Sequence, residues 1–345
     1  MIMRVMNFNR EENEVIVVEN VLPSVEDVLL SLDDDCRRVK PISDNTEWFA
    51  PISDNESKGI TLRQLAASAD IVNKNNELAH GVNAYTLIQE VNRVANECGY
   101  TTTIRDLFVA DNRNKTCNGI EVNKQLCEQY RETTKTANIP FAATTFNRVY
   151  AVITLNDLRS DTHIASIAIS RTQIGTSVAI GANCTMCRNL CVFGVENEVH
   201  TYGKGSIPKE LLIESVRRMI RNYDFQRDRA IIEAMKKINI NESEIFMLLG
   251  QLTALRVATD SHIKAVKSKF GVEYFPLNNT QINRLVEGIL LAHEKQGIVT
   301  LYDLYQVCTA ISKPTNLAYE NIIPQTREIF TFLDSNFDLV ASLEK

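Results

Sequence analysis

The sequence lacks the long apolar run that a membrane-spanning helix requires. Such a helix needs roughly 18 or more consecutive apolar residues, and the 345-residue chain contains no stretch of that kind. Its first residues also lack the basic start, the continuous apolar centre and the small-residue cleavage site of a secretory signal. We therefore expect no transmembrane helix, no membrane partner and a cytoplasmic location.

The short motifs of the common catalytic classes are also absent. Neither a G-x-x-x-x-G-K-[ST] phosphate loop nor a G-x-S-x-G elbow occurs, and the histidines show no H-x-x-x-H or H-x-E spacing. Gly203-Lys204-Gly205-Ser206 matches only the end of a phosphate loop. Asp157 and Asp161 flank Arg159 in a pattern that fits turn caps or, less well, a metal site. We expect a protein without enzymatic activity and without a cofactor.

Charge is distributed unevenly along the chain. The formal net charge is -6, but residues 1–60 hold thirteen acidic and six basic side chains. Residues 204–237 hold nine basic and five acidic side chains, a net of +4. Two interpretations stay open: a basic helical segment that meets a polyanion, or two ordinary solvated surfaces.

Hydrophobic periodicity predicts an α+β fold. Alternation near 100–109, 141–155, 164–170 and 175–182 indicates strands of a mainly antiparallel sheet, and an apolar stripe over Val82 to Cys98 indicates the helix packed on it. From Pro208 onward the period is helical, with Leu211, Leu212, Val216, Met219 and Ile220 as the first apolar face. We expect an acidic, partly irregular leader at 1–59, an α+β domain at 60–203 and a helical domain at 204–345.

Three of the eight cysteines lie close together in the sequence. Cys184, Cys187 and Cys191 could supply thiolates to zinc or an iron–sulfur cluster, with His200, Cys117 or Cys127 as a further ligand. The usual zinc pattern has two separated C-x-x-C pairs, however, and only one is present. The run is also apolar, and a free cysteine there behaves as a small hydrophobic residue. We therefore expect packing thiols and no bound metal.

The same region resembles a known but uncharacterised family. Arg171-Thr172-Gln173, a glycine-containing strand and then Cys187-Arg188-Asn189-Leu190-Cys191 resemble the Cys-x-Asn signature of the phage/plasmid-like domain-of-unknown-function family of phages and conjugative elements. Leu277 to Asn283 and Thr300 to Tyr305 extend the resemblance, which covers roughly residues 50 to 335. It implies a mobile-element accessory protein in a bacterial host cell. The helix–strand–strand–strand order is also similar to that of phage single-strand annealing proteins.

The preferred functional hypothesis is single-stranded DNA binding or annealing, in the setting of recombination. Such a site needs cations along the backbone and aromatic faces for base stacking. The candidates are Arg171, Arg188, Lys204, Lys209, Arg217, Arg218 and Arg221, with Tyr202 and Tyr223 as stacking groups. The alternative is a protein-interaction factor (assembly, virion or host-interference) with no nucleic-acid role. A homo-oligomer is compatible with either.

Overall fold

A computed structural model describes most of the chain between residues 82 and 339 and short segments before it. The described residues are 7–8, 15–16, 49–51, 57–66, 68, 82–110, 138–140, 148–172, 175–186, 189–202, 208–257, 279–296, 300–310 and 322–339. Among these residues, no helix combines the length and the apolar content needed to cross a membrane.

The centre of the molecule is a seven-stranded antiparallel sheet. Its order is β10-β9-β8-β7-β5-β4, and β11 also pairs with β9. The strands are β4 (Ser57–Gly59), β5 (Thr102–Ala110), β7 (Arg148–Arg159), β8 (His163–Arg171), β9 (Gly175–Cys184), β10 (Leu190–Cys191) and β11 (Glu198–Tyr202). The predicted α+β class and the antiparallel arrangement are confirmed. Two further pairs are β1 (Asn7–Phe8) with β2 (Val15–Ile16), and β3 (Phe49–Pro51) with β6 (Asn138–Pro140).

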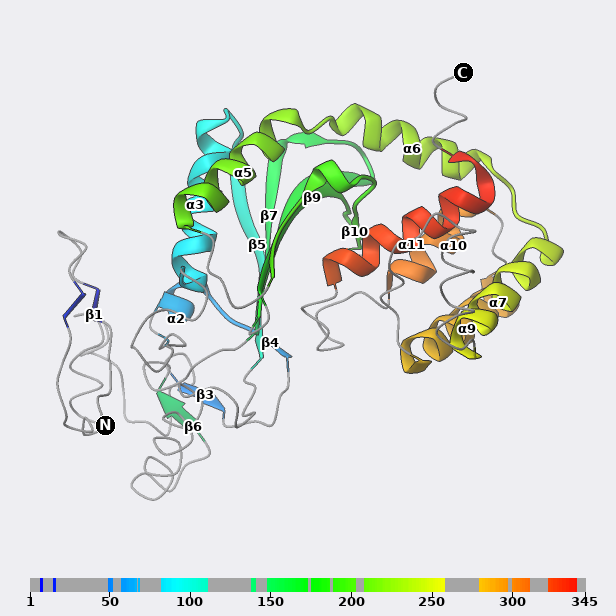
Figure 1. Ribbon diagram of the computed structural model, residues 1–345, viewed down its shortest axis with the longest axis horizontal. Helices are drawn as coiled ribbons and strands as arrows, with labels where there is room; N and C mark the ends of the chain where they lie inside the picture. The colour runs from blue at the N-terminus through cyan, green and yellow to red at the C-terminus, as the bar shows by residue number, and fades with distance from the viewer. Residues whose placement is uncertain are drawn as a thin grey trace.

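The helices precede and follow the sheet in sequence and lie on both sides of it (Figure 1). Before and within the sheet region come α2 (Leu62–Ala66), α3 (Ala84–Glu97) and the short 3-10 helix η4 (Val195–Asn197). The later helices are α5 (Lys209–Asn222), α6 (Phe225–Lys237), α7 (Glu242–Val257), α9 (Asn279–Gln296), α10 (Leu301–Thr309) and α11 (Ile322–Phe337). The described C-terminal part is thus helical, as predicted.

The alternation of the strands divides the core between the two faces of the sheet. Val149, Ala151 and Ile153 of β7 belong to the main core, together with apolar residues of α3, α5 and α6. Tyr150 and Val152 point the other way, into a smaller cluster with the first turn of α11. Successive strand residues point to opposite faces, so both faces of β7 are buried. This explains why the strand reads as a nearly continuous apolar run.

Local sequence signals set several helix ends. The side chain of Asn83 accepts a hydrogen bond from the Thr86 backbone N–H at 2.6 Å at the start of α3. Thr300 and Asp303 form a reciprocal capping box at the start of α10, which satisfies backbone donors that a helix leaves unpaired. Gly99 follows α3 with a φ of +95°, a conformation that glycine adopts without strain. The predicted stop of this helix is confirmed.

The main core is continuous across the boundary expected near residue 203. One cluster joins sheet residues such as Ile167 and Ile180 to Val216 of α5 and to Leu285 of α9. One detail of the predicted α5 face is wrong: Leu211 is 61% exposed, and Ile213 is buried instead. The reason is that residues three and four apart share a helix face. Buried Leu212, Val216 and Met219 therefore place Leu211 on the solvent side.

Candidate nucleic-acid interface

The solvent-facing stripe of α5 carries two of the three arginines predicted to contact DNA. Arg218 and Arg221 are exposed. They are three positions apart and are therefore neighbours on the helix surface. None of the described carboxylates forms an ion pair with either guanidinium. The C-terminal half of this stripe therefore presents two neighbouring guanidinium groups to solvent.

Arg217, the third arginine, is turned toward α3. Its Nη1 lies 2.8 Å from Oε2 of Glu97, and its Nε lies 3.2 Å from Oε2 of Glu214. The hydrogen bond from Arg217 lowers the pKa of Glu97, with Arg93 adding to the effect. Arg93 also contacts the Glu97 carboxylate. Arg217 thus links α5 to α3, and its charge is already partly neutralised.

Burial corrects two of the nine predicted contact residues. Arg171 at the end of β8 is only 2% exposed, because its register partners Val149 and Thr176 place it inside the sheet. Tyr223 is 8% exposed, and its hydroxyl donates a 2.7 Å hydrogen bond to the carboxylate of Asp228. Neither side chain is available for a phosphate or a base on the surface of this fold.

The other predicted contact residues are only partly placed. Lys209 is the first residue of α5 and is half-buried. Arg188, Lys204 and the side chain of Tyr202 lie outside the described residues. They stay predictions of the sequence.

α6 adds an exposed arginine that was not a candidate in the sequence hypothesis. Arg229 is exposed and donates to the side-chain oxygen of Gln226 at 3.1 Å. Of the other α6 cations, Arg227 lies 2.6 Å from Glu196 and Lys236 lies 2.7 Å from Glu233, whereas Lys237 is exposed at the end of the helix. Helical spacing beyond the α5–α6 junction could have suggested Arg229, but nothing in the sequence separates it from its paired neighbours.

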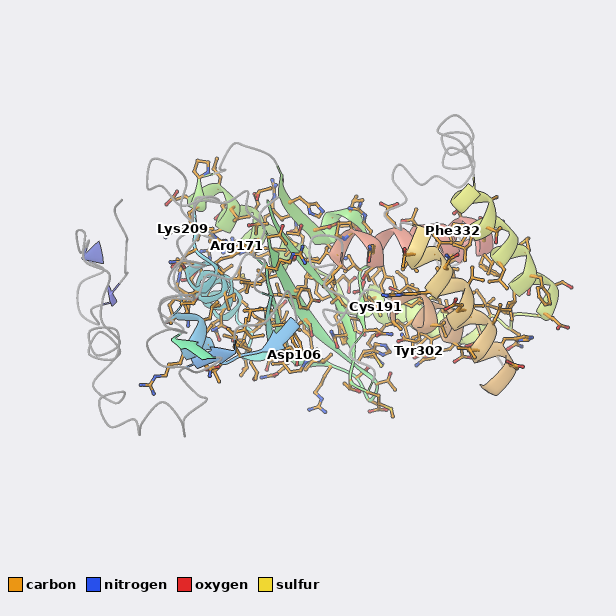
Figure 2. All side chains as sticks on the ribbon, turned by 90° about the horizontal axis from the view of Figure 1, so that it is seen from below. Asp106, Arg171, Cys191, Lys209, Tyr302 and Phe332 are labelled. Atoms are coloured by element: carbon orange, nitrogen blue, oxygen red, sulfur yellow. The ribbon has the colours of Figure 1, made fainter. Side chains whose placement is uncertain are left out.

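The described cysteines of the cluster lie at the edge of the sheet. Cys184 ends β9 and Cys191 lies opposite Ala182 in the β9–β10 pair. Burial raises the pKa of the Cys191 thiol far above its usual range, so this thiol is neither a ready nucleophile nor a thiolate ligand. Figure 2 places Cys191 where the sheet meets the C-terminal helices. No three potential metal ligands converge within the described part of the chain, and Cys187 lies outside it.

His163 of β8 pairs with Cys184 of β9, and each of its ring nitrogens lies within hydrogen-bond distance of a hydroxyl group. Its Nδ1 is 2.8 Å from the Thr162 hydroxyl, and its Nε2 is 2.9 Å from the Tyr302 hydroxyl of α10. Burial, assisted by the charge of Lys236, lowers the pKa of this histidine. The neutral ring therefore ties the sheet to α10.

A serine, a histidine and a glutamate lie in series on β9 and β11. The hydroxyl of Ser177 is 2.8 Å from Nδ1 of His200, and Nε2 of His200 faces the carboxylate of Glu198. Such a series resembles a hydrolytic triad, but Ser177 is 4% exposed. The Glu198 carboxylate is also held by Arg327 of α11. The arrangement fixes the edge of the sheet to α11 and offers no route for a substrate.

Comparison of the chain with protein-family models, with curated proteins and with solved structures gives no match. The geometry of the described residues is therefore the basis for any functional assignment.

Proposed function

We propose that this protein is an accessory protein of a phage or mobile element that binds single-stranded DNA through the surface of α5 and the start of α6, without catalysis. The observation that carries the proposal is the pair Arg218 and Arg221, exposed on adjacent turns and without a carboxylate partner among the described residues. Arg229 of α6 is a further exposed arginine, beyond the helix junction in the sequence.

Arginine suits this role because its planar guanidinium donates two parallel hydrogen bonds to a phosphate. Arg217 takes part only after exchanging its carboxylate partners for a phosphate. Surface ion pairs contribute at most about 1 kcal/mol, so this exchange costs little. With Tyr223 buried, the exposed side chains that the structure describes on α5 are suited to phosphate contacts, which carry no sequence information. We therefore expect binding that is independent of base sequence.

A matched pair of double variants tests the proposal. Arg218→Ala/Arg221→Ala removes the two exposed cations of α5. The control, Arg159→Ala/Arg284→Ala, removes one exposed arginine from the end of β7 and one from α9. Binding of a fluorescein-labelled oligo(dT) strand is measured by anisotropy at low salt. We expect the α5 double variant to bind at least about tenfold more weakly and the control to bind like the wild type. Equal loss in both variants would show only a general effect of net charge.

One observation favours a second function, a protein-interaction factor with no nucleic-acid role. Large apolar side chains are exposed on two adjacent helices: Phe246 and Met247 of α7, and Leu290 and Leu291 of α9. The same anisotropy experiment separates the two functions. If the chain binds no strand at low salt, the protein-interaction function is the one that remains.

A further inference from the structure

The end of the molecule farthest from α3 exposes an apolar surface on two neighbouring helices. Figure 1 shows α7 and α9 side by side there. The exposed fractions are 54% for Phe246, 46% for Met247, 41% for Leu290 and 50% for Leu291. Single exposed apolar residues are ordinary, whereas a contiguous apolar patch marks an interaction site.

A contact between the two helices shows that these residues lie at the same level. Nε2 of His293 lies 3.8 Å from Oε1 of Glu242. Phe246 follows Glu242 by one turn, and Leu290 precedes His293 by one turn. Because residues three and four apart share a helix face, Phe246 and Leu290 lie beside this contact, one turn along each helix. Met247 and Leu291 each follow one of these residues by one position and are also exposed. We call the exposed side of the two helices that carries these four side chains the α7–α9 surface.

Gly250 makes a notch in this surface. It follows Phe246 and Met247 by one turn on the exposed stripe, and a Cβ at this position would have no atom within 4 Å. Packing inside the chain therefore does not require glycine here, although glycine inside a helix costs about 1 kcal/mol relative to alanine. A glycine on a helix surface permits close approach of another backbone. The notch fits a ridge of side chains from a second helix.

The carboxylates that border the four apolar side chains select the partner, and the exposed Arg284 lies one turn farther along α9, before Glu287. Glu287 and Glu294 are exposed and lie one turn before and one turn after Leu290 and Leu291. Glu242, with 70% of its side chain exposed, borders Phe246. A second copy that used the same surface would place these carboxylates against each other, because a two-fold contact joins identical patches. Like charges facing each other across an interface oppose binding.

We propose that the α7–α9 surface binds an amphipathic helix with a basic polar face, presented by another protein. The apolar side of that helix covers Phe246, Met247 and the two leucines, and one of its ridges enters the notch at Gly250. Its lysines or arginines meet Glu242, Glu287 and Glu294. This mode of recognition is a helix lying in an apolar groove. The site shares no residue with the cationic surface of α5 and does not depend on DNA binding.

The test uses two labelled helical peptides of about 18 residues, enough for five turns. One combines leucine with lysine in an amphipathic pattern, and the other has glutamate in place of lysine. Anisotropy titration of the full chain should show clear preference for the lysine peptide. Glu287→Lys/Glu294→Lys should reverse that preference. Equal affinity for the two peptides, or an unchanged preference in the charge variant, would overturn the proposal.

Two further variants separate binding from folding. Phe246→Ser/Leu290→Ser should weaken binding of the lysine peptide at least about tenfold, as loss of buried apolar anchors does. Gly250→Gln should weaken it comparably while the melting temperature is kept or raised, because glutamine favours a helix more than glycine does. Leu211→Ser, which removes an exposed leucine from α5, is the control and should change nothing.

Two other results would assign the surface to a different occupant. A dimer in sedimentation equilibrium that Phe246→Ser dissociates would identify a second copy of this chain. Retention on vesicles of phosphatidylcholine and phosphatidylglycerol that is lost in the same variant would identify a lipid surface. Either result contradicts the proposal of a basic helix.

Discussion

The hydroxyl of Tyr223, the residue that caps the C-terminal end of α5, donates a 2.7 Å hydrogen bond to the carboxylate of Asp228 in the first turn of α6. Both side chains are buried, so the pair fixes the junction between the two helices that carry the proposed DNA surface. Burial raises the pKa of Asp228 to about 7, although the Tyr223 hydrogen bond opposes the shift. This buried acid makes stability depend on pH.

We predict that the protein becomes less stable as the pH rises from about 4 to about 7. In this range the unfolded chain has already released the Asp228 proton, whose ordinary pKa is about 3.9, while the native chain keeps it. The free energy of unfolding therefore falls, by up to about 4 kcal/mol, and is constant above the native pKa. Asp228→Asn removes this contribution.

Urea unfolding of wild type and Asp228→Asn at several pH values between 4 and 8 measures the effect. The free energy of unfolding of the variant, relative to that of the wild type, should increase as the pH rises. A difference in unfolding free energy that stays the same at every pH would show that Asp228 ionises normally in the native state.

We predict opposite effects of alanine at two glycines. A Cβ at Gly181 of β9 would lie 2.1 Å from the carbonyl oxygen of Cys191 on β10. Because that oxygen belongs to the backbone, the strands must separate, and Gly181→Ala should cost about 1–3 kcal/mol or more. Gly250→Ala meets no atom within 4 Å and should stabilise the protein by about 1 kcal/mol. Thermal unfolding of both variants provides the measurement, and equal melting temperatures would contradict the register of β9 and β10.

The buried carboxylate of Glu198 depends on Arg327. The Glu198 side chain is 1% exposed, and its carboxylate contacts Arg327, which also lies 2.8 Å from Glu328. Arg327→Met leaves a buried charge without its main partner and should cost on the order of 3 kcal/mol. Adding Glu198→Gln should recover much of that loss. The double-mutant cycle is read by chemical denaturation, and a cost below about 0.5 kcal/mol for Arg327→Met would place this pair among ordinary surface contacts.

The patterns within single elements predicted most of the fold. The alternation of β7, β8 and β9 and the apolar stripe of α3 depend on local periodicity, and the structure confirms all four elements. Leu211 shows the limit of this reasoning. Two adjacent leucines fit a helical stripe almost equally well, and only the position of α3 and the sheet decides that Leu212 is the buried one.

The candidate site was less predictable because it depends on contacts between distant residues. Arg217 pairs with Glu97, which is 120 positions earlier in the chain, and the sequence near Arg217 does not indicate this partner. Tyr223 reads as a surface aromatic beside arginines, but its partner Asp228 draws it into the core. Charge patterning therefore located the basic helix, whereas only the tertiary structure separated its paired cations from its exposed ones.

The salt dependence of single-strand binding tests the central claim most directly. Each phosphate contact on a single strand contributes about 0.7 to the slope of log Kobs against log salt. Between about 50 and 200 mM salt, Arg218→Ala/Arg221→Ala should therefore reduce the magnitude of the slope by about 1.4, while Arg159→Ala/Arg284→Ala leaves it unchanged. An identical slope in wild type and the α5 double variant, or no binding of any strand by the wild type at the lowest salt, would contradict the account.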